Sequence, residues 1–264
     1  MALIDPQLLK ARLGSLAGRF DVDALDACDS TNSELMRRAD RGAPSGSVIV
    51  ADRQSAGRGR RGRSWLSSPE RSLTFSILWR FPGPMARLAG LSLAVGVGIA
   101  RALEQMGAAG IGLKWPNDVL LRQCDGDFAK LAGVLVELSS DRRGMQAVIG
   151  IGLNLAMPEE PLPQPVAGLA QAMRVEPDRH VVLATLLAAL HEVFEVFAVD
   201  GFPALKSAWQ EHHAWQDELV CLQDEHGVVE QGRCLGVGDD GCLVLETARG
   251  QQSIYSGDVS LRRA

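Results

Sequence analysis

The segment from Gly57 to Trp65 carries residues whose types and spacing could do chemistry. It reads GRGRRGRSW, so arginines alternate with glycines in a chain whose formal net charge is -5. The four arginines are Arg58, Arg60, Arg61 and Arg63. A fold gains little from gathering guanidinium groups, because they repel one another and none can lose its proton. Glycines let the backbone approach a ligand closely. The segment predicts a flexible loop that closes on a phosphate or carboxylate, and the alternative is a solvated basic turn.

A second polar motif, KWPND, begins at Lys114 and ends at Asp118. Pro116 holds the preceding Trp115 in an extended conformation, and the Asn117-Asp118 pair favours a tight turn. The motif predicts one lysine and two polar side chains fixed at the edge of a sheet. An ordinary hairpin with a packed tryptophan is the alternative.

Two further segments have polar residues next to apolar runs. Lys130 precedes LAGVLVEL and could reach a phosphate from the mouth of a strand, or it could be a solvated strand end. The segment GIGLN, from Gly150 to Asn154, lacks the third glycine and the following helix of a dinucleotide-binding fingerprint. We expect its glycines to allow close approach of a ligand and Asn154 to be a polar contact. A plain central strand is the alternative.

The hydrophobic pattern predicts the elements that position these motifs. Helices are expected at residues 1–24, 30–39, 86–106, 180–199 and 203–213. In the second of these helices, Thr31 and Glu34 fit a capping box. Strands are expected at residues 47–51, 72–81, 112–115, 119–122, 129–138 and 146–155. The pattern indicates a mixed α/β fold in which helices flank a sheet.

Composition changes near Trp215, and the remainder of the chain alternates short strands with glycine-containing turns. This pattern predicts a small C-terminal β-barrel. A length of 264 residues is sufficient for one large domain and one small one.

Bulk properties exclude several classes of protein. An isoelectric point near 5.6 argues against a general nucleic-acid binder. The five cysteines include no CxxC pair, so we expect reduced thiols in a cytoplasmic protein. The first residues lack the apolar core of a secretory signal, and no apolar run reaches the roughly 18 residues needed to cross a bilayer.

The order STN, QSAGRGRRGRSW, KWPND, KLAGVLVEL, GIGLNL, followed by a small β domain, resembles the biotin–protein ligases. The resemblance extends over about residues 25–262, nearly the whole chain. It implies that ATP activates the biotin carboxylate as biotinyl-5′-adenylate, and that a lysine of a carrier protein then attacks this mixed anhydride. It also implies an α+β catalytic domain over residues 1–214. This domain has a mixed β-sheet flanked by helices, as in class II synthetases, and an SH3-like β-barrel follows over residues 215–264.

The same resemblance assigns roles to residues. The catalytic residues it implies are Lys130, Arg58 and Asp118. The biotin-binding residues are Ser30, Thr31, Asn32, Gln54, Arg58, Gly59, Arg60, Lys130 and Gly133. The ATP-binding residues are Arg58, Arg60, Arg61, Arg63, Lys114, Asn117, Asp118 and Asn154. Asp118 would act as a base for the incoming lysine amine or would orient it. No metal ligand is identified.

The resemblance further implies ATP with Mg²⁺, biotin as the substrate, and the biotin carboxyl carrier protein of acetyl-CoA carboxylase or a related carboxylase as the partner. Homodimers occur in the family. Only about 24 residues precede the ligase core, so no DNA binding is expected. Between Leu155 and Val193 there is no Phe, Trp or Tyr to stack on adenine, and Leu169 is an aliphatic candidate for that contact.

Two alternatives remain open. Lipoate– or octanoate–protein ligases and transferases share the broad fold and the carboxylate chemistry. A non-enzymatic module that binds anions or nucleic acid would use the arginine loop alone. The acid that supports ATP–pyrophosphate exchange distinguishes the first, and salt-sensitive nucleic-acid binding without adenylate formation distinguishes the second.

Overall fold

A computed structural model describes residues 2–160, 162–176, 178–224, 227–255 and 259–263. Within these residues, seven strands form a sheet in the order β1-β2-β3-β7-β6-β5-β4. Their bounds are β1 Asp21–Cys28, β2 Ser47–Gln54, β3 Ser72–Phe81, β4 Ile111–Lys114, β5 Asp118–Arg122, β6 Phe128–Asp141 and β7 Gly144–Asn154. Strands β1 and β2 pair in parallel and the other neighbours pair antiparallel, so the expected mixed sheet is confirmed.

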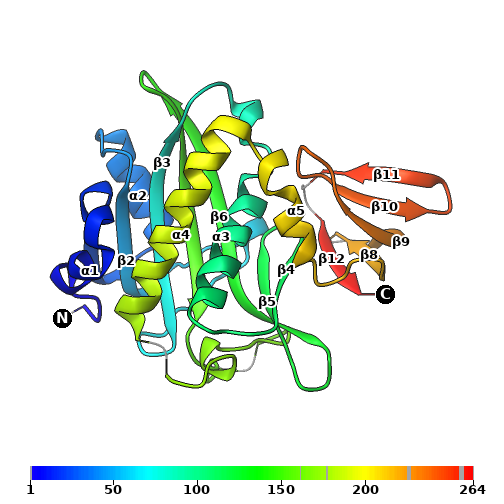
Figure 1. Cartoon of the computed structure of the whole chain (residues 1–264), viewed down its shortest axis with the longest axis horizontal. Helices are drawn as coiled ribbons and strands as arrows, with labels where there is room; N and C mark the ends of the chain where they lie inside the picture. Colours follow the sequence, from blue (N-terminus) through cyan, green and yellow to red (C-terminus); the bar gives the residue numbers. More distant parts are fainter. Residues whose placement is uncertain (1, 161, 177, 225–226, 256–258, 264) are drawn as a thin grey trace.

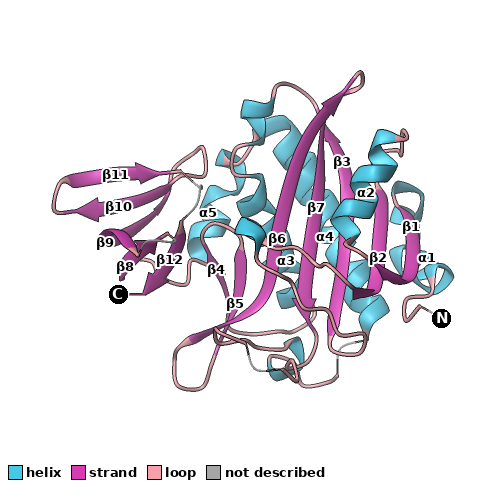
Figure 2. Ribbon diagram, turned by 180° about the vertical axis from the view of Figure 1, so that it is seen from behind, coloured by secondary structure: helices cyan, strands magenta, loops and turns pink. Residues whose placement is uncertain are grey.

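The helices divide unequally between the two faces of this sheet (Figures 1 and 2). Their bounds are α1 Pro6–Leu13, α2 Thr31–Asp40, α3 Leu91–Gln105, α4 Arg179–Asp200 and α5 Pro203–Glu211. Helices α1, α3 and α4 cover one face and share the large hydrophobic core with it. Helix α2 covers only part of the other face and packs through a small separate cluster around Leu35. The rest of that face is left open to form a site.

Helices α3 and α4 form the apolar layer behind the sheet. The segments Met85–Gln105 and Arg179–Asp200 are long and apolar enough to cross a membrane, and in this fold most of each apolar stretch is buried. The glycines in α3 allow close packing on its neighbours. A Cβ on Gly98 would lie 3.0 Å from Leu190 of α4, and one on Gly96 would lie 3.4 Å from Leu113 of β4.

The expectation of one helix over residues 1–24 is wrong at its C-terminal end. Helix α1 ends at Leu13, Gly14 has a positive φ of 55°, and Asp21–Cys28 forms the edge strand β1. The sequence DVDALDAC gives no strand signal because aspartate and alanine are depleted in strands. Its pairing with β2 is a tertiary interaction that the local pattern does not contain.

The capping box expected at the start of α2 is also absent. Ser30 is the N-cap residue and makes no side-chain capping bond. The Thr31 hydroxyl donates to Gln54, and Glu34 accepts from Arg37 and Arg38. The polar side chains at this helix start are therefore directed to other partners, and Thr31 faces the site described below.

The C-terminal residues form a second sheet, with strand order β11-β10-β9-β8-β12. Its strands, all antiparallel, are β8 Leu219–Gln223, β9 Val228–Val237, β10 Leu243–Thr247, β11 Gly250–Ile254 and β12 Ser260–Arg263. The sheet lies beside β4 and α5 (Figure 1). Trp115 joins the two domains directly, because its indole Nε1 donates to the Gly241 carbonyl at 3.0 Å.

Candidate active site

A cavity of about 640 Å³ opens on the face of the sheet that α2 leaves uncovered. Its walls come from the start of α2, the basic loop, the KWPND turn, the centre of the sheet and β12. Of the residues that the sequence proposes for the site, all but Leu169 line it: Ser30, Thr31, Asn32, Gln54, Arg58, Gly59, Arg60, Arg61, Arg63, Lys114, Asn117, Asp118, Lys130, Gly133 and Asn154. The structure therefore brings these residues together, while the role of each remains a prediction.

Strand alternation explains why the cavity lies on this face. Residues i and i+2 of a strand share a face, and on β3 and β7 the residues on the cavity side are small or polar. They are Thr74, Ser76, Gly150 and Gly152. The alternate positions, such as Phe75 and Ile149, belong to the large core behind the sheet. The sequence thus provides one apolar face and one face with room for ligands.

The glycines of GIGLN make room for side chains of this chain, and Gly150 and Gly152 also line the cavity, so the close approach of a ligand to them stays a prediction. A Cβ on Gly150 would overlap the Asn32 amide, and a Cβ on Gly152 would overlap the Trp65 indole. Trp65 is accordingly a wall of the cavity. The Nζ of Lys130 lies 5.8 Å from the centre of the Trp65 ring, so the indole also faces the cationic end of the cavity.

One end of the cavity is polar but uncharged. Gln54 Oε1 accepts from the Thr31 backbone N–H at 2.7 Å, which fixes the amide beside the start of α2. The Ser76 hydroxyl lies 2.7 Å from Thr31 Oγ1 and donates to Asn32 Oδ1 at 2.6 Å. These groups, buried between α2 and β3, suit a neutral ring that carries hydrogen-bonding atoms.

The other end of the cavity is cationic and is organised around one carboxylate. Lys130 Nζ lies 2.7 Å from Asp118 Oδ1, and Lys114 Nζ lies 3.4 Å from Asp118 Oδ2. Burial raises the pKa of Asp118, but the two ammonium groups outweigh burial and hold the pKa below its ordinary value. Asp118 is therefore ionised at neutral pH. Burial is the largest influence on Lys114 and lowers its pKa, Asp118 opposes that effect, and the net shift of the Lys114 pKa is downward.

The basic loop is an ordered turn over the cavity mouth. Gly59 N donates to Arg63 O at 2.7 Å and Trp65 N donates to Gly57 O at 2.9 Å. Arg61 and Gly62 have positive φ values of 59° and 68°, which reverse the chain.

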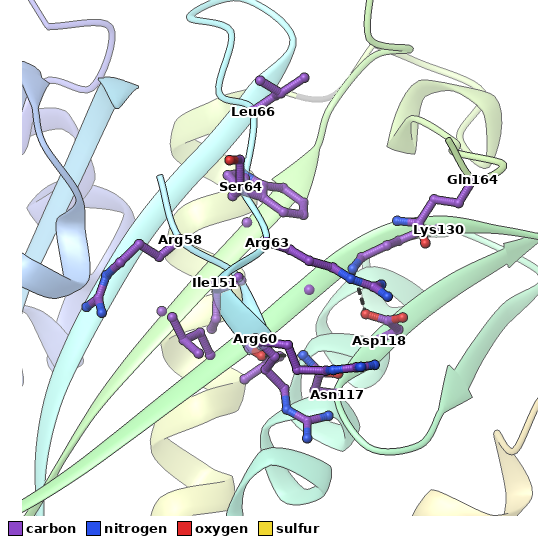
Figure 3. A pocket seen from close by; sticks show the side chains of 18 of the residues that line it. Arg58, Arg60, Arg63, Ser64, Leu66, Asn117, Asp118, Lys130, Ile151 and Gln164 are labelled. Carbon is purple, nitrogen blue, oxygen red and sulfur yellow. Dashed lines mark hydrogen bonds and ion pairs between the residues drawn. The ribbon is translucent and has the colours of Figure 1, made fainter. Parts of the chain in front are cut away.

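The arginine side chains of this loop point in different directions (Figure 3). Arg60 and Arg63 extend toward Asp118, whereas Arg58 points away from it. Arg58 instead forms an ion pair with Glu137 at 2.7 Å. Arg58 thus lines the cavity without approaching the cationic end in this conformation.

The two asparagines proposed for the nucleotide have structural partners. Asn117 Nδ2 donates to the Val134 carbonyl at 2.7 Å, which holds the KWPND turn against β6. Asn154 Nδ2 donates to the carbonyls of Ala167 and Lys130 at 3.1 and 3.4 Å. Since these amide N–H groups are engaged, Asn117 and Asn154 offer a ligand chiefly their side-chain oxygens.

The aliphatic contact proposed for adenine is wrong in its detail. Leu169 is fully buried in the core and does not line the cavity, whereas Leu162 and Val166 from the same long loop do. Leu162 and Leu169 belong to the same loop. The sequence therefore predicted the correct loop, but it did not predict which of its side chains face the cavity.

No motif in the sequence indicates which residues of the second domain belong to the site. Ser260, Leu261 and Arg262 of β12 line the cavity, so the C-terminal sheet contributes a cation. Arg262 lies in no motif, and only the docking of the two domains brings it to Lys114, whose pKa it lowers.

The described residues contain no cluster of histidine, cysteine or carboxylate side chains that could hold a metal ion. Within the same residues, Asp118 is the one carboxylate in the cavity lining, and it already contacts two lysines. The donor set does not form a protein cage for a divalent cation. It does fit a Mg²⁺ ion that enters bound to phosphate oxygens and requires at most one carboxylate.

Two family models and several known proteins match this chain. Residues 26–154 match the biotin/lipoate A/B protein ligase family, and residues 219–262 match the biotin protein ligase C-terminal domain. The bifunctional ligase/repressor BirA of Escherichia coli is 34% identical over 267 aligned positions, which cover 98% of this chain and 79% of that protein. The chain belongs to the biotin protein ligase family.

Other members of the family agree with this assignment. The biotin–[acetyl-CoA-carboxylase] ligase of Paracoccus denitrificans is 32% identical, and the match covers 88% of this chain and 96% of that protein. A biotin protein ligase of Aquifex aeolicus, solved in complex with biotin and ATP, superposes with a TM-score of 0.78 at 33% identity. That match covers 92% of this chain and 99% of the solved one.

Proposed function

We propose that this protein attaches biotin to a lysine of a biotin carboxyl carrier protein, using ATP and forming biotinyl-5′-adenylate. The observation that carries the proposal is the two-ended cavity, in which a neutral polar end at Thr31 and Gln54 adjoins a cationic end at Lys130. A ligand with an uncharged ring and a carboxylate fits such a cavity. The related ligases named for acetyl-CoA carboxylase support biotin as the acid and a carboxylase carrier as the acceptor.

In the first step, a biotin carboxylate oxygen bonds to the α-phosphorus of ATP, and the bond to the leaving pyrophosphate breaks. Two anionic groups must approach each other, so cations that screen both of them lower the barrier. Lys130 is positioned for this role, with Arg60 and Arg63 extending toward the same region (Figure 3). The loop that carries the arginines also shields the mixed anhydride from water.

In the second step, the carrier lysine nitrogen bonds to the acyl carbon, and AMP leaves with the electron pair of the broken C–O bond. The amine must be neutral to attack. Asp118 has a lowered pKa and two lysine partners, so it is a weak acceptor for the proton of an ammonium group. We therefore assign Asp118 the orienting role: it holds the lysines in place and accepts a hydrogen bond from the incoming amine.

Mg²⁺ would enter this site with the nucleotide, held by phosphate oxygens, and would supply additional charge neutralisation. Among the described residues that line the cavity, Asp118 is the carboxylate that would hold it. The screening of the reacting anions by Lys130 and the arginines does not depend on that contact.

The cellular setting and the assembly are further parts of the proposal. The five cysteines are all free thiols, which supports a location in the reducing cytoplasm. Homodimer formation and the absence of DNA binding remain predictions from the family resemblance. Gel filtration tests homodimer formation, and a binding assay with duplex DNA that contains no chosen operator sequence tests the absence of DNA binding.

The function is tested with purified protein, Mg²⁺-ATP and a biotin carboxyl carrier domain. We expect pyrophosphate exchange that depends on biotin, and a carrier that gains one biotin on its lysine. Lipoic and octanoic acids serve as competing substrates in parallel reactions. Exchange driven by lipoate or octanoate and not by biotin would overturn the assignment of the substrate.

A further inference from the structure

Glu137 lies on β6, on the same strand face as the cavity-lining Leu135, and one of its carboxylate oxygens holds two segments that are distant in sequence. Its Oε2 accepts from Asn32 Nδ2 at 2.9 Å and from Arg58 Nη2 at 2.7 Å. Asn32 belongs to the first turn of α2, and Arg58 lies near the N-terminal end of the basic loop. Glu137 is thus the point at which the neutral end of the cavity and the loop are joined.

The Asn32 side of this arrangement is rigid. Leu135 and Glu137 share a face of β6, and Leu135 pairs with Gly150, whose missing side chain leaves space for the Asn32 amide. Asn32 Nδ2 also donates to the Leu135 carbonyl at 3.3 Å, and its Oδ1 accepts from Ser76. With both amide hydrogens engaged, the orientation of Asn32 is determined by Glu137 and Leu135.

The Arg58 side of the arrangement is more accessible. The side chain of Arg58 is 44% exposed and that of Glu137 is 28% exposed. Ion pairs at such exposure contribute little to global stability, so the contact acts locally on the loop. Figure 3 shows Arg58 directed away from Asp118 and Lys130. The pairing with Glu137 accounts for that direction.

We propose that Glu137 is a positioning residue that couples the ring-binding end of the cavity to the basic loop. It fixes the amide of Asn32 and anchors Arg58, so that the loop lies over the cavity before the acid binds. The proposal rests on the function given above, in which that acid is biotin. Because preorganisation reduces the ordering cost of binding, the effect falls on biotin affinity and not on the chemical step.

Two substitutions separate the two contacts of Glu137, one with Asn32 and one with Arg58. In Glu137→Gln, the new amide oxygen still accepts from Asn32, but the charge that attracts Arg58 is gone. We expect biotin to bind about two- to fivefold more weakly, the range that a partly exposed ion pair supports. In Glu137→Ala, both partners are lost and the affinity falls further. Titration calorimetry measures both affinities, and pyrophosphate exchange at saturating biotin should keep the wild-type kcat in Glu137→Gln.

Limited proteolysis examines the loop without any ligand. Trypsin cleavage after Arg60, Arg61 and Arg63 should accelerate in Glu137→Gln, while the global unfolding midpoint stays unchanged. If Glu137 acts through Arg58, then Arg58→Ala should produce the same acceleration, and the double variant should be no faster than either single one. Additive acceleration in the double variant contradicts the coupling.

The matched control is Asp141→Asn, which removes another ion pair of β6, between Asp141 and Arg80 at 2.9 Å. It should alter neither biotin affinity nor loop cleavage. Wild-type affinity and wild-type cleavage rates in both Glu137 variants overturn the proposal. A wild-type protein that fails to bind biotin refutes the proposed function instead, and the cleavage experiment still decides whether Glu137 anchors the loop.

Discussion

Lys130 and Asp118 form an ion pair of 2.7 Å at the cationic end of the cavity, and both side chains are largely buried. Lys114 contacts the second carboxylate oxygen at 3.4 Å, so that one anion separates two cations. Removing one partner of a buried ion pair leaves the others uncompensated. The three residues should therefore respond to substitution as a unit, and their effects should not add.

Lys130→Ala should slow adenylation. The substitution removes a cation from the place where two anions must meet, and the loss of one such group costs about 10²- to 10³-fold in rate. Biotin-dependent ATP–pyrophosphate exchange measures this step alone. The control is Lys206→Ala, which breaks an ion pair with the exposed Asp239 in the second domain and should leave exchange unchanged. Normal exchange in Lys130→Ala would refute the role.

Asp118→Asn should impair the transfer step. The amide keeps the size of the side chain but no longer holds Lys130 and Lys114 by charge, so the reacting groups shift. A misplacement of about 1 Å costs roughly 10²-fold in rate, and we expect a loss of that order. The measurement supplies preformed biotinyl-adenylate and follows biotin on the carrier domain. Unchanged transfer from the preformed intermediate would show that Asp118 neither orients nor deprotonates the amine.

The sequence predicted the members of the site well, because each motif is a short segment whose polar residues act together. GRGRRGR, KWPND and the lysine before LAGVLVEL all reach the same cavity. The sequence could not predict which segments pair or pack against one another. Strand β1 exists because β2 pairs with it, and Arg262 reaches the cavity because the second domain docks there. The hydrogen bonds of Thr31 likewise depend on Gln54 being folded beside it.

Gly152→Ala should disturb the cavity wall. The added Cβ would overlap the Trp65 indole, and forcing extra volume into a packed site costs typically 1–3 kcal/mol. We expect lower stability in urea denaturation, a changed Trp65 environment and weaker adenylation. Gly18→Ala is the matched control, since a Cβ there meets nothing within 4 Å. Equal stability and activity in the two variants would show that Trp65 moves aside without cost.

His213 should make stability depend on pH below neutrality. The residue is 8% exposed, its ring packs against Trp209 with centroids 4.6 Å apart, and its Nε2 lies 3.7 Å from the Cys234 sulfur of the second domain. Burial lowers the pKa of His213 to about 4, against small opposing effects from Gln216 and Asp217. Between that value and an unfolded pKa near 6.5, the unfolded chain binds a proton that the folded one does not, so folding stability decreases as pH falls.

The expected contribution is complete above about pH 6.5 and declines by roughly 3 kcal/mol as the pH falls to about 4, from 1.36 kcal/mol per pKa unit. The carboxylates with lowered pKa values, such as Asp29 and Asp178, add a dependence of the same sign at lower pH. The comparison is therefore between the wild type and His213→Gln, using urea denaturation at pH 7 and pH 4.5. The variant should start less stable at pH 7, because it loses the packing against Trp209, and should then lose less stability on acidification. Parallel losses in both proteins would show that His213 does not titrate on unfolding.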